Sequence, residues 1–483
     1  MNVKKELLII SSGRLISTLI ALISIRAVTS FLPPEKYGEL AILITIQMLC
    51  GLFLINPVGQ HINLNTHRWW DDKTIIPRLK SYRSYVIASS TFGAIIALGV
   101  FPPTNSTMII FNIFPVFAMV VAGTWNATFI PMLNMLGFRG HSVFWSIVTS
   151  STSLVTSILL VAIWTSATSW FVGQAIGMAV GALGARYQLN KQVSVEIRRQ
   201  PKIPLLSKDV IISYCLPLSL AAGLMWIQLS GYRFAIQFYW GLAQLGFIAV
   251  GLQLAGQIWA LIESLAIQFL YPFFFRRVSE QSDNSEIELA VSDLLNTLVP
   301  TYLLIAGLTI LTAPYLLKLL VAPEYSDAWL FVAAGAIVEL CRALGNLLGN
   351  AAHVRRKTIS LATPYALGAT VIIVCIFYSG TRQLDIKWAA AALVAGALAM
   401  IVSMTANMYT QVKFKLDKFR CFSSLLCMLG MASLIDSIPY ASSWISAIGY
   451  IIITSLIVAC LLFIMLWKNP ATSRLLSVQL RKI

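Results

Sequence analysis

Residues 443–467 read SWISAIGYIIITSLIVACLLFIMLW, a run of 25 residues without one charged side chain. A helix needs about 20 apolar residues to cross the hydrocarbon core of a bilayer. Similar runs recur along the whole chain. Of its 483 residues 58% are hydrophobic and 11% charged, whereas soluble domains are about a quarter charged. The sequence therefore predicts an all-α integral membrane protein, in which lipid covers most of the exterior.

The apolar runs predict about fourteen transmembrane helices. The expected spans are 8–31, 39–60, 84–101, 108–130, 142–164, 169–187, 210–231, 244–271, 294–314, 328–352, 359–378, 389–411, 422–439 and 443–467. The third is short, and the thirteenth is the weakest because Asp436 lies near its outer end.

The distribution of Lys and Arg predicts the orientation of the chain. If the N-terminus is cytoplasmic, 27 of the 35 Lys and Arg lie on the inner side and 5 on the outer side. Positive residues are enriched in cytoplasmic loops, so both termini are expected to be cytoplasmic. The net charge of +16 is then a feature of membrane topology. Its natural partners are anionic membrane lipids, and no nucleic acid is expected.

A basic, proline-containing loop at 191–209 divides the chain near its middle. We expect it to be a cytoplasmic linker between an N-terminal lobe of six spans (1–190) and a C-terminal lobe of six spans (210–411). Two additional spans and a cytoplasmic tail would occupy 412–483. A weak internal repeat agrees, because EKYGELAI at 35–42 and AQLGFIAV at 243–250 each place a Gly before a long apolar helix. The acidic loop 276–293 is expected to be a solvated connector.

Motifs of known enzymes are missing from the sequence. It contains no GxxxxGK[ST], GxSxG or HExxH pattern, and its seven Cys form no CxxC pair. We therefore expect no catalytic residue, no cofactor and no metal, and the chain is not expected to be an enzyme.

Ionisable residues inside spans are costly and are therefore candidates for function. In the first span Arg14 shares one helix face with Ser11, Ser17 and Thr18. That polar stripe suits a wall of a water-filled cavity. Arg26 lies nearer the outer end of the same span, where its side chain could instead reach the interface.

The tenth span carries a second polar stripe. Glu339, Arg342, Asn346 and Asn350 fall within an arc of about 80°. The stripe could line a cavity, and the amides that extend it favour this interpretation. Alternatively, Glu339 and Arg342 form a local ion pair that only fixes helix packing.

The eighth span repeats the pattern. Gln253, Gln257, Ser264 and Gln268 share a face, with Glu263 at its edge. Glu263 could carry a proton or could form a structural ion pair with Arg342 or Arg233, the latter on the outer side. Arginine binds phosphate in a bidentate manner, and amides suit sugar hydroxyls. The candidates for substrate binding are therefore Arg14, Arg26, Arg233, Arg342, Asn346, Asn350, Gln253 and Gln257, and those for ion coupling are Glu263 and Glu339.

Several segments resemble the polysaccharide flippase family of the multidrug, oligosaccharidyl-lipid and polysaccharide exporter superfamily. They are Gly13-Arg14, Leu32-Pro-Pro-Glu-Lys-Tyr-Gly38, Gly241-Leu-Ala-Gln-Leu-Gly246, Pro272 and the turn around Glu324-Tyr325, where Ala322-Pro323 replaces the usual Gly. The resemblance is spread over most of 1–360 and includes no catalytic signature.

The resemblance implies two six-helix lobes around a central cavity, plus two C-terminal helices. It implies export of a lipid-linked (undecaprenyl-diphosphate) oligosaccharide repeat unit across a bacterial inner membrane by alternating access. The product would be O-antigen of lipopolysaccharide, capsule or exopolysaccharide. A polysaccharide polymerase and a chain-length regulator would be partners, and Arg14 would be a cavity arginine.

Three alternatives stay open. A multidrug or toxin exporter of the same fold would favour an aromatic, acidic cavity. A peptidoglycan-precursor flippase would share the fourteen spans and a cationic cavity. A membrane glycosyltransferase or polymerase is disfavoured, because the outer loops are short.

Overall fold

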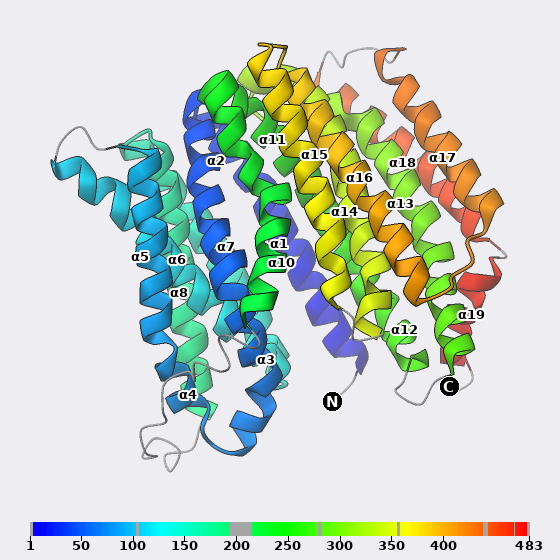
Figure 1. The fold of residues 1–483 in the computed structure, drawn as a ribbon, viewed down its shortest axis with the longest axis horizontal. Coiled ribbons are helices and arrows are strands. Elements are labelled where there is room, and N and C mark those ends of the chain that lie inside the picture. The colour runs from blue at the N-terminus through cyan, green and yellow to red at the C-terminus, as the bar shows by residue number, and fades with distance from the viewer. Residues whose placement is uncertain are drawn as a thin grey trace. The chain divides into compact units, whose positions relative to one another are not determined.

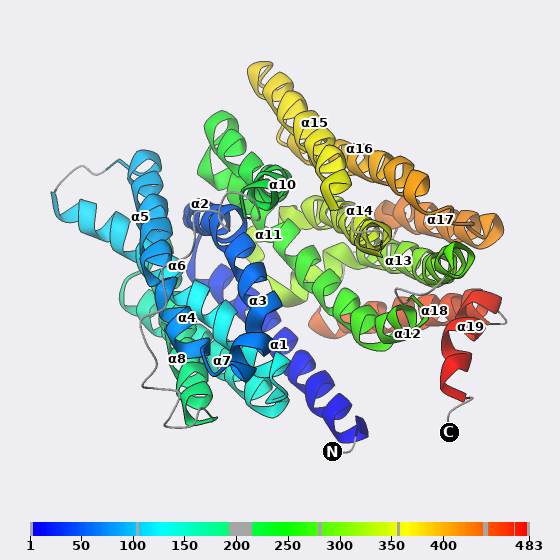
Figure 2. The ribbon, with the colours of Figure 1, turned by 60° about the horizontal axis from the view of Figure 1, so that its bottom comes forward.

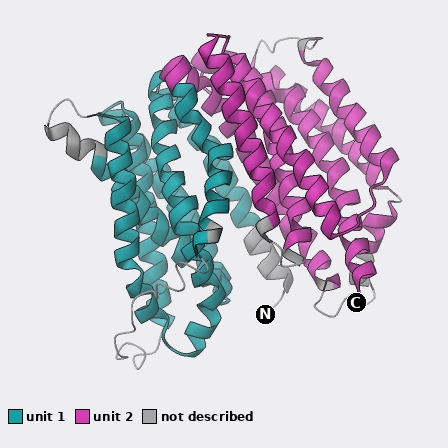
Figure 3. Cartoon of the chain, in the orientation of Figure 1, with its two compact units in different colours: residues 1–237 teal, residues 238–483 magenta. Residues whose placement is uncertain are grey.

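The computed structural model describes residues 3–102, 106–192, 215–278, 283–354, 358–437, 443–467 and 469–480. Within these ranges every regular element is a helix. The chain forms two compact units, unit 1 (residues 1–237) and unit 2 (residues 238–483), which Figure 3 shows in different colours. Most of the expected linker at 191–209 lies outside the described residues, so it stays a prediction.

Unit 1 holds the helices from the N-terminus to the start of α11 (Figure 1). They are α1 (Val3–Phe31), α2 (Pro34–Leu49), the π-helix η1 (Cys50–Ile55), α3 (Asn56–Asp71), α4 (Ile75–Ser81), α5 (Arg83–Val100), α6 (Ser106–Met135), α7 (Arg139–Ile163), α8 (Ala167–Gln192), α10 (Leu216–Trp226) and the π-helix η4 (Ile227–Gly231).

Unit 2 holds the remaining helices, and α11 crosses into it with a kink at Gly241, where φ is 82°. They are α11 (Tyr232–Phe269), α12 (Tyr271–Arg277), α13 (Asn284–Leu320), η5 (Pro323–Ala328), α14 (Trp329–Val354), η6 (Thr358–Leu361), α15 (Ala362–Thr381), α16 (Lys387–Gln411), α17 (Lys418–Ser433), η7 (Ile435–Ser437), α18 (Trp444–Leu466) and α19 (Pro470–Leu480).

The helices agree with the predicted spans. Among the described residues, 11 helical segments are long and apolar enough to cross a membrane. One of them, Ser219–Phe275, covers the seventh and eighth predicted spans together. The sixth and thirteenth predicted spans fall on α8, which ends in polar and basic residues, and on α17, which has only 16 residues. Each predicted span thus overlaps a helix, and the all-α membrane fold class is confirmed.

Small residues hold α7 and α8 together in unit 1. Gly173, Gly177 and Gly181 recur at every fourth position of α8, and a Cβ added at Gly177 would overlap Ser153 of α7. The close approach lets Ser157 Oγ donate to the carbonyl of Trp170 at 2.9 Å. Such spacing of small residues is a common basis for helix packing in lipid, where there is no hydrophobic drive between helices.

We therefore expect Gly177→Ala to destabilise unit 1 by about 1–3 kcal/mol, the usual cost of overpacking. The added methyl group can be accommodated only if α7 and α8 move apart. Gly59→Ala on α3 is the matched control, because a Cβ there meets nothing within 4 Å. Thermal unfolding of the two variants in detergent measures the difference, and equal melting temperatures would contradict the packing argument.

One end of unit 1 combines an aromatic core with positive charge. Trp69, Leu79, Phe129 and Leu189 pack together where α3, α4, α6 and α8 meet. The Lys and Arg residues at this end of the bundle are Arg68, Lys73, Arg78, Lys80, Arg83, Arg139, Arg186 and Lys191. The charge agrees with a cytoplasmic position for this end, which remains a prediction.

A buried carboxylate ties together the end of unit 2 at which α12 and α19 meet α13. Asp293 of α13 is fully buried, and its oxygens accept from Arg277 Nη1 of α12 at 2.9 Å and from Arg474 Nη2 of α19 at 2.6 Å. Beside it, Asn469 Nδ2 donates to the carbonyl of Asn296. The prediction that the acidic segment 276–293 is a solvated connector is therefore wrong for Asp293. Its carboxylate is a structural anchor for the C-terminal helix.

Candidate functional site

Two carboxylates and one guanidinium meet in unit 2 between α11 and α14. Arg342 Nη2 donates to Glu263 Oε2 at 2.5 Å, and Arg342 Nε donates to Glu339 Oε2 at 2.6 Å. Asn346 Nδ2 donates to the other oxygen of Glu263 at 3.0 Å. We call these four residues the carboxylate–arginine cluster. The polar stripes predicted on the eighth and tenth spans thus meet in one hydrogen-bonded group.

Small residues bring the two helices close enough for this contact. A Cβ at Gly335 of α14 would lie 3.0 Å from the Cβ of Ala255 and 3.2 Å from the Cα of Leu252 on α11. A Cβ at Gly256 would lie 3.4 Å from Glu339 Oε1. Because glycine allows backbones to approach closely, the short glutamate side chains can reach the partner helix.

The polar stripe of α14 continues beyond the cluster. Asn350 is 7% exposed, and its Nδ2 donates to the carbonyl of Leu347 at 3.0 Å and to the hydroxyl of Tyr271 at 3.2 Å. Tyr271 begins α12, so the stripe links α14 to a third helix. Sequence periodicity within α14 identifies Asn350 but gives no signal for Tyr271, which lies on a different element.

The cluster is partly buried and carries unequal charge. The side chains of Glu263, Glu339 and Arg342 are 14%, 18% and 21% exposed. With both carboxylates ionised, one guanidinium faces two negative charges, and the group has a net charge of −1. Excess charge away from bulk water is costly.

Ion pairing, which the sequence left open as an alternative role for Glu339 and for Glu263, is present for both residues. Glu339 pairs with Arg342 within α14, and Glu263 pairs with Arg342 rather than Arg233. The two carboxylates accept hydrogen bonds from Nη2 and Nε of Arg342. Fewer N–H groups of the guanidinium are therefore left to bind a phosphate group. Gln253 and Gln257 lie half-buried on α11, about 15 and 9 Å before Glu263 along the helix axis at about 1.5 Å per residue.

The two candidate arginines of the first span lie on α1 in unit 1. Gly13 faces α7, since a Cβ there would overlap Val143. This contact turns the neighbouring Arg14 outward, and its side chain is exposed. Arg26 is half-buried three turns further along the helix.

Arg233 lies in the first turn of α11, and its place on the outer side stays a prediction. Its Nη1 lies 3.4 Å from both the carbonyl of Ala41 and the hydroxyl of Thr45 on α2. Trp226 Nε1 donates to the carbonyl of Thr45 at 3.1 Å. Arg233 is half-buried, and within unit 1 it connects the first turn of α11 to α2.

Two π-helical segments flank this contact, and neither is foreseen from the sequence. η1 continues α2, and η4 lies between α10 and α11. Tyr85 Oη of α5 donates to the carbonyl of Leu54 in η1 at 2.8 Å. π-helical turns are rare and are often found at functional sites. No sequence signal would have located them, because they depend on how the helices pack.

Comparisons with known proteins locate the fold. Neither a scan against models of protein families nor a comparison with curated protein sequences gives a match. Among solved structures, the lipid II flippase MurJ in an inward closed conformation has a TM-score of 0.66 at 11% identity, covering 94% of this chain and 98% of that one. The chain has the fold of a membrane flippase.

The same fold occurs in drug transporters. A multidrug resistance MATE family transporter of the MOP superfamily matches in its outward-facing conformation, with a TM-score of 0.53 at 14% identity, over 88% of this chain and 97% of that one. A multidrug resistance MATE family transporter in an inward-facing conformation matches with a TM-score of 0.53 at 11% identity, over 86% of this chain and 95% of that one. At such low identities the comparisons establish the fold and leave the substrate open.

Proposed function

We propose that this protein translocates a lipid-linked oligosaccharide from the inner to the outer leaflet of a bacterial inner membrane by alternating access. The substrate would be a polyprenyl-diphosphate-linked repeat unit for surface polysaccharide. The polysaccharide polymerase and chain-length regulator would act on the product. In this proposal both termini are cytoplasmic, as the Lys and Arg distribution predicts.

The observation that carries the proposal is the likeness in fold to a flippase of a lipid-linked molecule, over almost the whole chain. The sequence resemblance to polysaccharide flippases points in the same direction. An ionised side chain exposed on an apolar transmembrane helix is costly unless it faces water or a charged ligand. Arg14, exposed on α1, therefore supports a route for an anionic head group.

Within this proposal the carboxylate–arginine cluster couples transport to an ion. Its net charge of −1 would be neutralised by one proton or monovalent cation, and that uptake would change the pairing of Glu263 with Arg342. A ligand shifts a conformational equilibrium only by its difference in affinity for the two states. An ion that breaks or forms a link between α11 and α14 satisfies this condition.

The two alternatives of the same fold differ in substrate. A flippase of peptidoglycan precursors would carry a similar diphosphate head group, so the group attached to the diphosphate distinguishes the two substrates. A multidrug exporter would bind organic cations. The negative cluster in unit 2 suits a cation, whereas Arg14 and Arg26 on α1 suit an anion.

Arg14→Ala is expected to abolish surface polysaccharide while the protein remains in the membrane. The side chain is exposed, so its removal leaves packing intact, whereas the head group loses a phosphate-binding donor. Arg342→Ala is expected to have the same effect on polysaccharide. Polysaccharide in cell extracts and protein in membrane fractions are measured together.

The matched control is Arg68→Ala on α3, which removes an arginine whose side chain is 79% exposed. It should leave polysaccharide at the parent level. Normal polysaccharide in both the Arg14 and Arg342 variants would contradict the assignment of these residues.

A further inference from the structure

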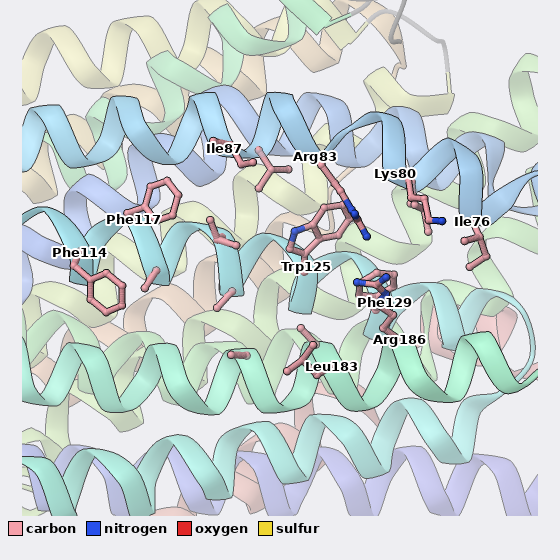
Figure 4. Close-up of a pocket in the computed structure, with 17 residues that line it drawn as sticks. Ile76, Lys80, Arg83, Ile87, Phe114, Phe117, Trp125, Phe129, Leu183 and Arg186 are labelled. Atoms are coloured by element: carbon pink, nitrogen blue, oxygen red, sulfur yellow. The ribbon is translucent and has the colours of Figure 1, made fainter. Parts of the chain in front are cut away.

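Unit 1 contains a cavity of about 490 Å³ between α4, α5, α6 and α8 (Figure 4). Its walls are formed by aliphatic and aromatic side chains such as Phe117 and Trp125. None of the 17 described residues that line it carries a hydroxyl, an amide or a carboxylate group. The cavity therefore offers apolar surface, the positive charge of its Lys and Arg residues, and one further donor, the indole N–H of Trp125.

The cavity exists because α6 and α8 present small residues to it. Ala118 and Ala122 lie one turn apart on α6, and Ala179 and Ala182 lie three residues apart on α8, so each pair shares a helix face. Figures 1 and 2 show these helices side by side, as their contacts require. Methyl groups leave open the space that larger side chains would fill.

Three cationic side chains gather at one end of the cavity. Figure 4 shows Lys80, Arg83 and Arg186 around that end, whereas Phe114 lies at the other. Lys80 and Arg83 are exposed and Arg186 is half-buried. Within the described part of the chain none of the three has an ion-pair partner. Their charge is available to an external anion.

The rim of the cavity is apolar and exposed. The side chains of Ile87, Phe114 and Leu183 are 52%, 59% and 65% exposed. Since α5 and α6 are long, apolar helices that qualify as membrane spans, Ile87 of α5 and Phe114 of α6 are expected to contact lipid. An acyl chain could therefore enter the cavity directly from the bilayer.

We propose that this cavity is a binding site for an anionic phospholipid of the bilayer. The phosphate group is held by Lys80, Arg83 and Arg186, through charge-assisted hydrogen bonds that arginine forms well with phosphate. An acyl chain lies against Phe117 and Trp125. With the predicted orientation the lipid comes from the cytoplasmic leaflet, which is the anionic one.

The lining chemistry favours a phospholipid over the lipid-linked saccharide of the transport cycle. Sugar hydroxyl groups need hydrogen-bonding partners when they leave water, and the described lining offers only donors, namely the three cations and the indole N–H of Trp125, with no side-chain acceptor. A single lipid bound here would contact α5, α6 and α8 together. It should therefore stabilise unit 1.

The test is lipid binding to the purified full-length protein, measured by native mass spectrometry and by thermal shift. Phosphatidylglycerol and phosphatidylcholine with identical acyl chains are the two probes, and a sugar-free polyprenyl diphosphate is the third. The parent protein is expected to retain phosphatidylglycerol and to melt at a higher temperature in its presence. Phosphatidylcholine should do neither.

The variant Lys80→Gln/Arg83→Gln/Arg186→Gln should bind phosphatidylglycerol on the order of a hundredfold more weakly, from the loss of three near-surface charges. Ala118→Phe is a second variant that keeps every charge and fills the cavity, and it should lose the thermal shift. The matched control is Lys191→Gln. It removes an exposed cation of α8, the helix that carries Arg186, at a position outside the cavity.

Three results would overturn the proposal. They are undiminished phosphatidylglycerol binding in both cavity variants, an equal loss of binding in the Lys191 control, and stronger retention of polyprenyl diphosphate than of phosphatidylglycerol. The transport activity of the protein does not enter the measurement. Failure of the proposed function would therefore leave this test intact.

Discussion

Glu263→Gln is expected to reduce the transport rate on the order of a hundredfold, while the protein stays folded. An effect of this size is near the upper end of the usual coupling between two sites. The substitution keeps the shape of the side chain and removes one of the two negative charges around Arg342. The cluster then becomes neutral without taking up an ion. If ion uptake drives the conformational change, the driving force is lost.

The fold should tolerate this change. Arg342 keeps its hydrogen bond to Glu339 at 2.6 Å, and the carbonyl oxygen of the introduced amide could still accept from the guanidinium. The matched control is Glu286→Gln, the same change at an exposed position near the start of α13. Transport rates in proteoliposomes and melting temperatures are measured for both variants. An unchanged rate for Glu263→Gln would exclude a coupling role for the cluster.

Asp293→Ala is expected to destabilise unit 2 by about 3 kcal/mol, the scale for breaking a buried ion pair. The carboxylate is fully buried and forms ion pairs with both Arg277 and Arg474. Without it Arg277, whose side chain is 20% exposed, remains in a place that water reaches poorly. The side chain of Arg474 is 47% exposed and can return to water, which keeps the cost near the lower end of the range.

Chemical unfolding in detergent measures this loss, and proteolysis of the C-terminal segment reports release of α19. Asp283→Ala is the matched control, since Asp283 is exposed and its side chain does not cap α13. The double variant Asp293→Ala/Arg474→Ala should cost less than the sum of the single changes, because the two residues share one interaction. Equal stability of the Asp293 and Asp283 variants would refute the anchoring role.

The sequence predicts the membrane fold well, because the length of apolar runs and the period of a helix are local properties. Polar stripes on single helices are equally local, and this is why the sequence identifies Glu339, Arg342 and Asn346. Which residue completes the group depends on the register between α11 and α14. From the sequence, either Arg342 or Arg233 could be the ion-pair partner of Glu263, and only the structure identifies Arg342.

Contacts between distant segments account for what the sequence does not predict. Asp293 follows a hydrophilic, acidic stretch that resembles a loop, and only the packing of α12 and α19 reveals that it is buried. Arg233 precedes a glycine-containing turn, which predicts a place outside the spans. In the structure its guanidinium lies against Thr45, almost two hundred positions earlier in the chain.

The most direct test of the central claim is transport by the purified protein in sealed proteoliposomes. A fluorescent polyprenyl-diphosphate-linked oligosaccharide is placed in one leaflet, an ion gradient or potential is applied, and its appearance in the other leaflet is followed with a membrane-impermeant quencher. We predict translocation by the parent protein and the Arg68→Ala control, and little by Arg14→Ala or Glu263→Gln. Transport of organic cations without any movement of the lipid-linked oligosaccharide would contradict the account.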